Sequence, residues 1–85
     1  MKMTEQISDL GAAMDKLNEI QEDLAVPRNV RLKIQGIVST LKEGIELSIK
    51  VNKALNELGE IVNDVNLQAY TRTQIWDVMS SLEKL

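Results

Sequence analysis

Three cations lie close together near the middle of the 85-residue chain: Arg28, Arg31 and Lys33. Pro27 precedes them, and proline can open a helix at its first position, so we expect the cations in the first turns of that helix. A helix N-terminus attracts anions, and two guanidinium groups beside it could grip a phosphate. Nucleic-acid binding is therefore open, although the same cations could instead pair with the acidic residues of segment 19–23.

The carboxylates form two rows at helical spacing, which could hold Mg²⁺ or Ca²⁺ through oxygen ligands. The rows are Asp15, Glu19 and Glu22, and Glu57, Glu60 and Asp64. A solvated helix face has the same spacing, so the pattern does not separate the two interpretations, and we assign no metal ligand.

The composition excludes several common kinds of catalytic site. The chain contains no histidine and no cysteine. This excludes the commonest general base near neutral pH, zinc sites of the Cys/His type and nucleophilic sites of the Ser-His-Asp or Cys-His type. The four glycines are isolated, so there is no phosphate-binding loop. We predict a protein that is not an enzyme, with no catalytic residue and no cofactor.

The elements that position these groups follow from apolar periodicity. Apolar residues spaced three and four apart predict four helices, with stripes over residues 7–24, 30–41, 51–65 and 75–82. Helices joined by short connections pack as antiparallel neighbours. The predicted fold is all-α, an antiparallel four-helix up-and-down bundle in a single domain of residues 1–85.

The chain also repeats itself at a constant offset of 41 residues. Between segments 7–41 and 48–82, nine of 35 aligned pairs are identical, among them Asp23/Asp64 and Arg31/Arg72. The interpretation is a bundle built from two similar hairpins, about 4–43 and about 48–84. The alternative is that any two amphipathic hairpins of equal length align their apolar stripes.

The recurring Asp and Arg suggest a structural clasp across each turn. Asp at a helix C-terminus and Arg at the start of the next helix each oppose the helix dipole, at a cost of about 0.3–1 kcal/mol when exposed. The costs would cancel if the guanidinium folded back onto the carboxylate. We therefore predict bidentate Arg–Asp pairs between Asp23 and Arg31 and between Asp64 and Arg72; a pair of related acidic sites is the alternative.

Trp76 is the residue that most suggests a protein partner. It aligns with Gln35 in the repeat, at the flank of the apolar stripe, and tryptophan is enriched in binding hot spots. A tryptophan that seals the edge of the bundle is the alternative. Val26 and Leu67, in the predicted turns, are further candidate contacts, unless they close the ends of the core.

The composition also indicates where the protein is located and whether it contacts a membrane. A secreted domain of this size usually relies on disulfides, and none can form here. No stretch approaches the run of about 20 apolar residues that spans a membrane. We therefore expect a cytoplasmic protein that does not contact a membrane.

Two motifs resemble a known family. E-I-x-x-D-x-x-V-P-R-N-V-R over residues 19–31 and R-T-x-I-W-x-V-x-S-x-L-E over 72–83 are similar to the small archaeal family known as uncharacterised protein family 0147. The resemblance implies a bromodomain-like four-helix bundle, an archaeal cytoplasmic setting and no established activity. The segment D-V-N-L-Q at 64–68 departs from the Asp-Pro-Asn-Met-Pro expected there, which predicts a looser turn.

These observations favour a non-catalytic protein-interaction module, bound to an unknown protein partner or to a second copy of itself. The alternative is a nucleic-acid-associated protein that uses Arg28, Arg31 and Lys33.

Overall fold

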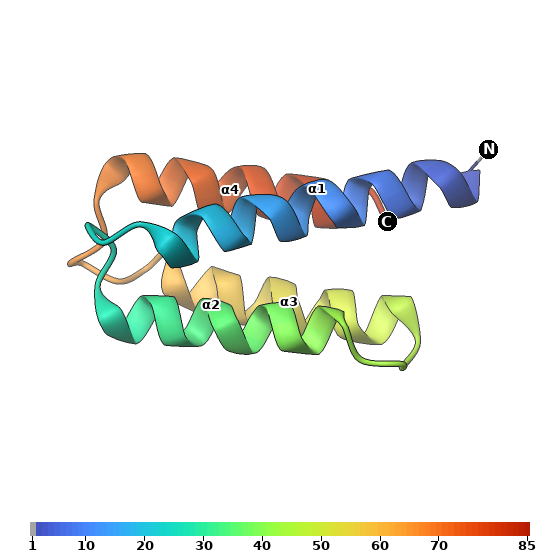
Figure 1. Cartoon of the computed structure of the whole chain (residues 1–85), viewed down its shortest axis with the longest axis horizontal. Helices are drawn as coiled ribbons and strands as arrows, with labels where there is room; N and C mark the ends of the chain where they lie inside the picture. Colours follow the sequence, from blue (N-terminus) through green and yellow to red (C-terminus); the bar gives the residue numbers. More distant parts are fainter. Residues whose placement is uncertain (1) are drawn as a thin grey trace.

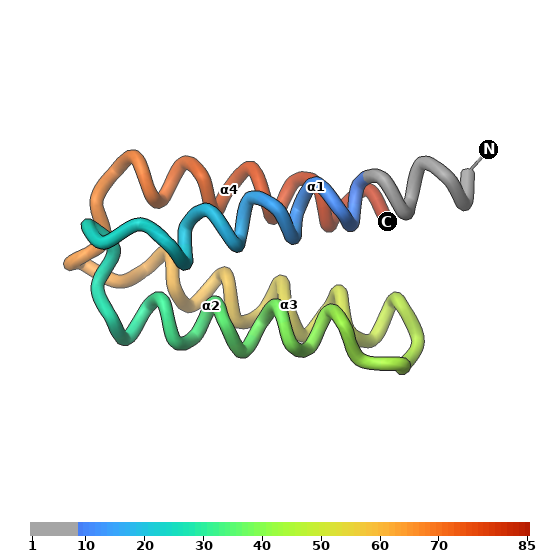
Figure 2. The backbone as a smooth tube through the Cα atoms, viewed as in Figure 1, coloured from blue at the N-terminus to red at the C-terminus, as the bar shows by residue number. Residues whose placement is uncertain are grey.

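Four helices account for most of the chain in a computed structural model: α1 Lys2–Glu22, α2 Arg28–Leu41, α3 Leu47–Ile61 and α4 Ala69–Glu83. The structure describes the backbone of residues 2–85 and the side chains of residues 9–85 (Figure 2). No strand occurs within this part of the chain. The predicted all-α four-helix bundle is confirmed, whereas its likeness to bromodomains and its origin by duplication stay predictions.

The helices run up and down around one core (Figure 1). Helix α1 packs against α2 and α4, and α3 packs against the same two helices, in a body that measures 39 × 20 × 20 Å. The α1–α2 and α3–α4 turns lie at the same end of the bundle, which we call the two-turn end, while the α2–α3 turn and the C-terminus lie towards the other end. Residues of the two turns that are 41 apart in sequence thus meet at one end of the molecule.

The core is formed by apolar side chains from all four helices. Both copies of several repeated positions are buried, and Leu17, Leu58, Ile34 and Ile75 have no exposed surface. Removing apolar surface from water is the main favourable contribution to folding, at about 25 cal/mol per Å². The periodic positions therefore place the two hairpins against each other across a shared interior.

Two apolar residues assigned to the stripes lie outside the core. Helix α1 ends at Glu22 and α3 ends at Ile61, earlier than the stripes predicted. The stripe residues Leu24 and Val65 lie beyond these helix ends, in the turns, where they are 84% and 90% exposed. Their assignment to the helical stripes was wrong, because the helical spacing no longer applies once the chain leaves the helix.

Two helical glycines have room for a side chain. A Cβ added at Gly36 in α2 or Gly59 in α3 would meet nothing within 4 Å beyond its own helix. Alanine is favoured over glycine inside a helix by about 1 kcal/mol. We expect Gly36→Ala and Gly59→Ala each to raise the free energy of unfolding by about 0.5–1 kcal/mol in urea titrations. A lower stability for either variant would contradict the open surroundings of the two glycines.

Candidate functional site at the two-turn end

The α1–α2 and α3–α4 turns contain the same hydrogen bond. An Asp23 carboxylate oxygen (Oδ1) accepts from the Ala25 N–H at 2.9 Å, and Asp64 Oδ1 accepts from the Asn66 N–H, also at 2.9 Å. This side-chain bond to the backbone two residues on is typical of an Asx turn. Each recurring aspartate therefore shapes its own turn.

Arg72 ties the α3–α4 turn to the start of α4. Its Nε donates to the Val62 carbonyl at 2.9 Å, and its Nη2 donates to the carbonyls of Asp64 at 3.1 Å and Leu67 at 3.4 Å. The last carbonyls of a helix have no partner within the helix, and Arg72 satisfies one of them together with two carbonyls of the turn. Arg72 therefore braces the turn at residues 64–68, while its looseness relative to the Asp-Pro-Asn-Met-Pro turn stays a prediction.

Arg31 occupies the equivalent place in the first hairpin but makes fewer bonds. Its Nε donates to the Val26 carbonyl at 3.2 Å. Among the side chains of residues 9–85, no hydrogen bond joins Arg31 to Asp23 or Arg72 to the Asp64 carboxylate. The predicted Arg–Asp clasp is wrong in its acceptor, because the guanidinium binds main-chain carbonyls while the carboxylate binds main-chain N–H groups.

Val26 and Leu67 are not partner contacts. They are only 2% and 5% exposed and belong to the core, which they close at the two-turn end. The surface of this end carries Leu24 and Val65 instead, and Tyr70, at the start of α4, is 68% exposed. Both the outward pair, 24 and 65, and the inward pair, 26 and 67, are 41 residues apart, so the repeat matches the members of each pair without showing which pair is buried.

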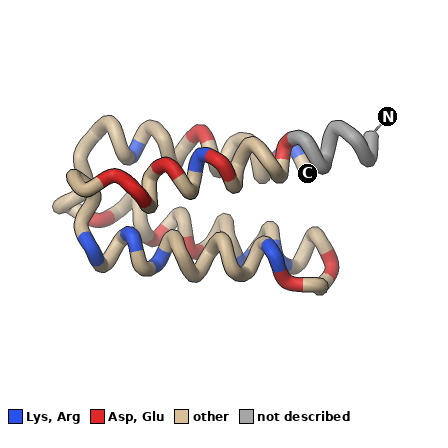
Figure 3. The backbone as a smooth tube through the Cα atoms, viewed as in Figure 1, with Lys and Arg blue, Asp and Glu red and all other residues tan. Residues whose placement is uncertain are grey.

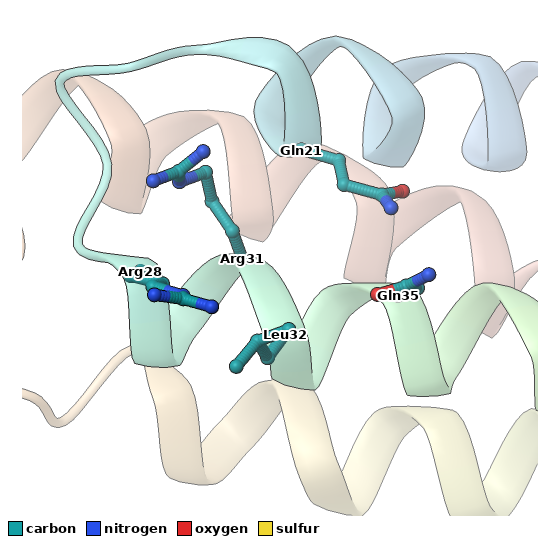
Figure 4. Close-up of a pocket in the computed structure, with 5 residues that line it drawn as sticks. All are labelled: Gln21, Arg28, Arg31, Leu32 and Gln35. Carbon is teal, nitrogen blue, oxygen red and sulfur yellow. The ribbon is translucent and has the colours of Figure 1, made fainter.

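The cations of α2 partly separate in space. A small open hollow of about 180 Å³ lies between the end of α1 and the start of α2, lined by Gln21, Arg28, Arg31, Leu32 and Gln35 (Figure 4). Lys33 is exposed and does not line the hollow. Two of the three predicted phosphate contacts therefore come together, and two glutamines that the sequence reasoning missed join them.

Trp76 lies on α4, one turn beyond Arg72, and is 53% exposed. Because positions four apart share a helix face, Trp76 lies on the same face of α4 as Arg72. Half of its surface is therefore available, and its role as a partner contact stays a prediction.

The acidic rows do not form a metal centre in the described part of the chain. No group of three or more potential metal-ligating side chains gathers among the described residues. Asp15, Glu19 and Glu22 lie along α1, and Figure 3 shows their acidic stretch beside the basic first turns of α2. Nor is any helix in the described part both long and apolar enough to span a membrane.

The whole chain matches a known protein family. The family model of the Uncharacterised protein family (UPF0147) covers residues 1–85. The chain belongs to this family. A UPF0147 protein of Methanocaldococcus jannaschii is 43% identical over 70 residues, which cover 81% of this chain and 75% of that protein. A second, from Archaeoglobus fulgidus, is 36% identical over 76 residues, covering 89% of this chain and 87% of that protein.

A solved structure of a UPF0147 protein has the same fold. The crystal structure from Thermoplasma acidophilum superposes with a TM-score of 0.93 at 30% sequence identity, over 96% of this chain and 98% of that one. The Methanocaldococcus and Archaeoglobus relatives are both archaeal proteins, as the resemblance implied. UPF0147 is a family of unknown function, so the surface of this member is the guide to its role.

Proposed function

We propose that this UPF0147 protein is a non-catalytic protein-interaction module whose two-turn end inserts into an apolar recess of a partner protein. The observation that carries the proposal is the pair Leu24 and Val65, which present aliphatic side chains to solvent at equivalent positions of two adjacent turns, 84% and 90% exposed. The two turns that carry them lie at the same end of the bundle (Figure 1), and apolar surface exposed at one place on a protein is typical of interaction sites.

The turns that carry these side chains are held in place before any partner arrives. Asx turns fix both, and arginine bonds to main-chain carbonyls brace them. A preformed loop loses less conformational entropy on binding. Burying a Leu or Val side chain contributes about 1.5–3 kcal/mol, so the two together could supply an affinity increment of about a hundredfold or more.

The size of this end favours a different protein over a second copy. The bundle is narrow, with extents of 20 Å in both short directions, so a flat end-to-end contact offers a small area compared with the about 800 Å² per partner of a standard interface. A partner that surrounds the end also gains contact with Tyr70 and the sides of the helices. Self-association through this end is accordingly expected to be weak.

The decisive experiment compares capture by variants that differ at one end of the bundle only. The double variant Leu24→Ser/Val65→Ser changes the two-turn end, and Ile49→Ser changes an exposed apolar side chain near the start of α3, at the far end. Partners captured from native cells after nuclease treatment are identified, purified and titrated against each variant. We expect the double variant to lose about a hundredfold or more in affinity and Ile49→Ser to bind like the parent chain.

Three outcomes would count against this proposal. The double variant could bind the purified partner as tightly as the parent chain does. Capture could disappear on nuclease treatment, which would favour the nucleic-acid alternative. Sedimentation could instead show a stable dimer that the double variant dissociates, in which case the two-turn end would serve self-association.

A further inference from the structure

The arginines at equivalent positions of the two hairpins, Arg31 and Arg72, make different numbers of hydrogen bonds. Arg31 has donors that the fold does not use. Arg72 commits Nε and Nη2 to three main-chain carbonyls. Within the described part of the chain, only the Nε of Arg31 donates a hydrogen bond, to the Val26 carbonyl. The Arg31 side chain also lines the hollow between α1 and α2, with its guanidinium on the side of the α1–α2 turn (Figure 4). In the α1–α2 turn, only the Nε of Arg31 bonds to the main chain. The N–H groups of its two terminal nitrogens can therefore bind another acceptor.

The other residues of the hollow are not needed for the turn either. At the positions equivalent to Gln21, Arg28 and Gln35, the second hairpin has Val62, Ala69 and Trp76, and its turn makes the same Asx hydrogen bond. A second cation and two carboxamides are therefore a feature of the first hairpin alone. The turn geometry does not explain why they gather there.

The chemistry of the hollow is that of an oxyanion site. Arg28 and Arg31, three positions apart on one helix, carry like charges that repel each other at close range, and no carboxylate among the described side chains lines the hollow. None of these side chains caps the first turn of α2, whose N-terminal end carries a partial positive charge. Guanidinium groups match the geometry of phosphate oxygens, and the glutamine amides can add donors.

We propose that this hollow binds a single phosphate group, as inorganic phosphate or as the head of a small phosphomonoester. Leu32, 56% exposed, offers an apolar wall to the organic part of a phosphomonoester. An extended polyanion fits less well, because the hollow is small, at about 180 Å³, and the chain has a net charge of −3, which repels a long run of phosphates. The ligand is thus a discrete phosphate rather than a nucleic-acid backbone.

The test uses inorganic phosphate, phenyl phosphate and a short single-stranded RNA as separate probes. Each is titrated against the protein at an ionic strength of about 0.15 M, where exposed charges more than about 8 Å apart are screened. Heteronuclear NMR follows the side-chain N–H signals of Arg28, Arg31, Gln21 and Gln35. We expect saturable shifts at these groups with inorganic phosphate and phenyl phosphate.

Two variants that each remove one positive charge distinguish binding at the hollow from non-specific attraction of phosphate to a cationic surface. Arg28→Ala removes a guanidinium from the hollow, whereas Lys33→Ala removes a cation that lies outside the hollow on an exposed face of the same helix. We expect Arg28→Ala to raise the dissociation constant of phenyl phosphate about tenfold or more, as for the loss of a charge-assisted hydrogen bond, and Lys33→Ala to change it less than about twofold.

Equal weakening by the two variants would overturn the site, since binding would then follow net charge alone. So would an RNA oligonucleotide that binds while both phosphate probes leave the four side chains unshifted. Neither result bears on the docking of the two-turn end, which is tested with different residues.

Discussion

Replacing Arg72 with alanine is expected to lower the free energy of unfolding by about 2–3 kcal/mol, because the substitution removes charge-assisted donors from three main-chain carbonyls. The Val62 carbonyl would have to find water instead, the Asp64 carbonyl would keep only the Leu67 N–H, and the start of α4 would lose its link to the end of α3. For a domain of this size such a loss corresponds to a fall in Tm of roughly 10 °C or more. Thermal and urea denaturation followed by circular dichroism measure it.

Arg31→Ala is the matched control, since the same position in the first hairpin donates one hydrogen bond instead of three. Its expected loss is about 1 kcal/mol. Arg72→Lys is informative as well, because lysine keeps the charge but cannot reach several carbonyls at fixed angles, so it is expected to restore less than half of the stability. Equal losses for the two alanine variants would show that the extra bonds of Arg72 contribute nothing.

Leu67→Ala is expected to cost about 2–4 kcal/mol, the range for a buried leucine whose removal leaves a cavity. Leu67 lies in the α3–α4 turn, yet it is only 5% exposed and packs in the core. The same denaturation measurements apply. The expected loss is large for a turn residue, since turn positions are usually tolerant of change.

Val65→Ala, two residues earlier in the same turn, provides the contrast. Val65 is 90% exposed, and substitutions at exposed positions usually change stability by less than about 0.5 kcal/mol. A loss at Val65 that rivals the loss at Leu67 would mean that the turn faces the other way and that the docking surface has been assigned to the wrong residues.

Much of the fold was predictable because packed helices have apolar residues at regular spacing in the sequence. A helix buries the positions that recur every three or four residues, so Leu17, Ile34, Leu58 and Ile75 were recognisable as core residues from their spacing alone. The turns have no such spacing, because the direction of a side chain outside a helix depends on the backbone angles of that residue. Leu24 and Val26, both apolar and two apart, therefore could not be told apart as exposed and buried.

The arginine bonds show a second limit of sequence reasoning. The recurrence of Asp23 with Arg31 and of Asp64 with Arg72 correctly marked the residues that shape the turns. It could not identify the atoms that bond, because the carbonyls at a helix end compete for the guanidinium and every residue supplies one. Charge complementarity in the sequence pointed to the carboxylate, whereas the guanidinium bonds to the main chain.

The residues of the hollow were partly predictable from the spacing along one helix. Arg28, Arg31 and Gln35 stand at i, i+3 and i+7, which places them on one face, whereas Lys33 falls off this series. Grouping the cations by proximity in sequence included Lys33 and missed Gln35. Gln21 could not be predicted from the sequence, because its place in the hollow depends on how α1 packs against α2.

The placement of the α1–α2 and α3–α4 turns at one end has a practical outcome for how the molecule is handled. The C-terminus emerges towards the opposite end of a body 39 Å long, so an anchor, dye or affinity handle fused there projects away from Leu24 and Val65. Molecules grafted to a sensor chip by that terminus would all face the solution with their turns outermost, in uniform orientation and unobstructed by the tether.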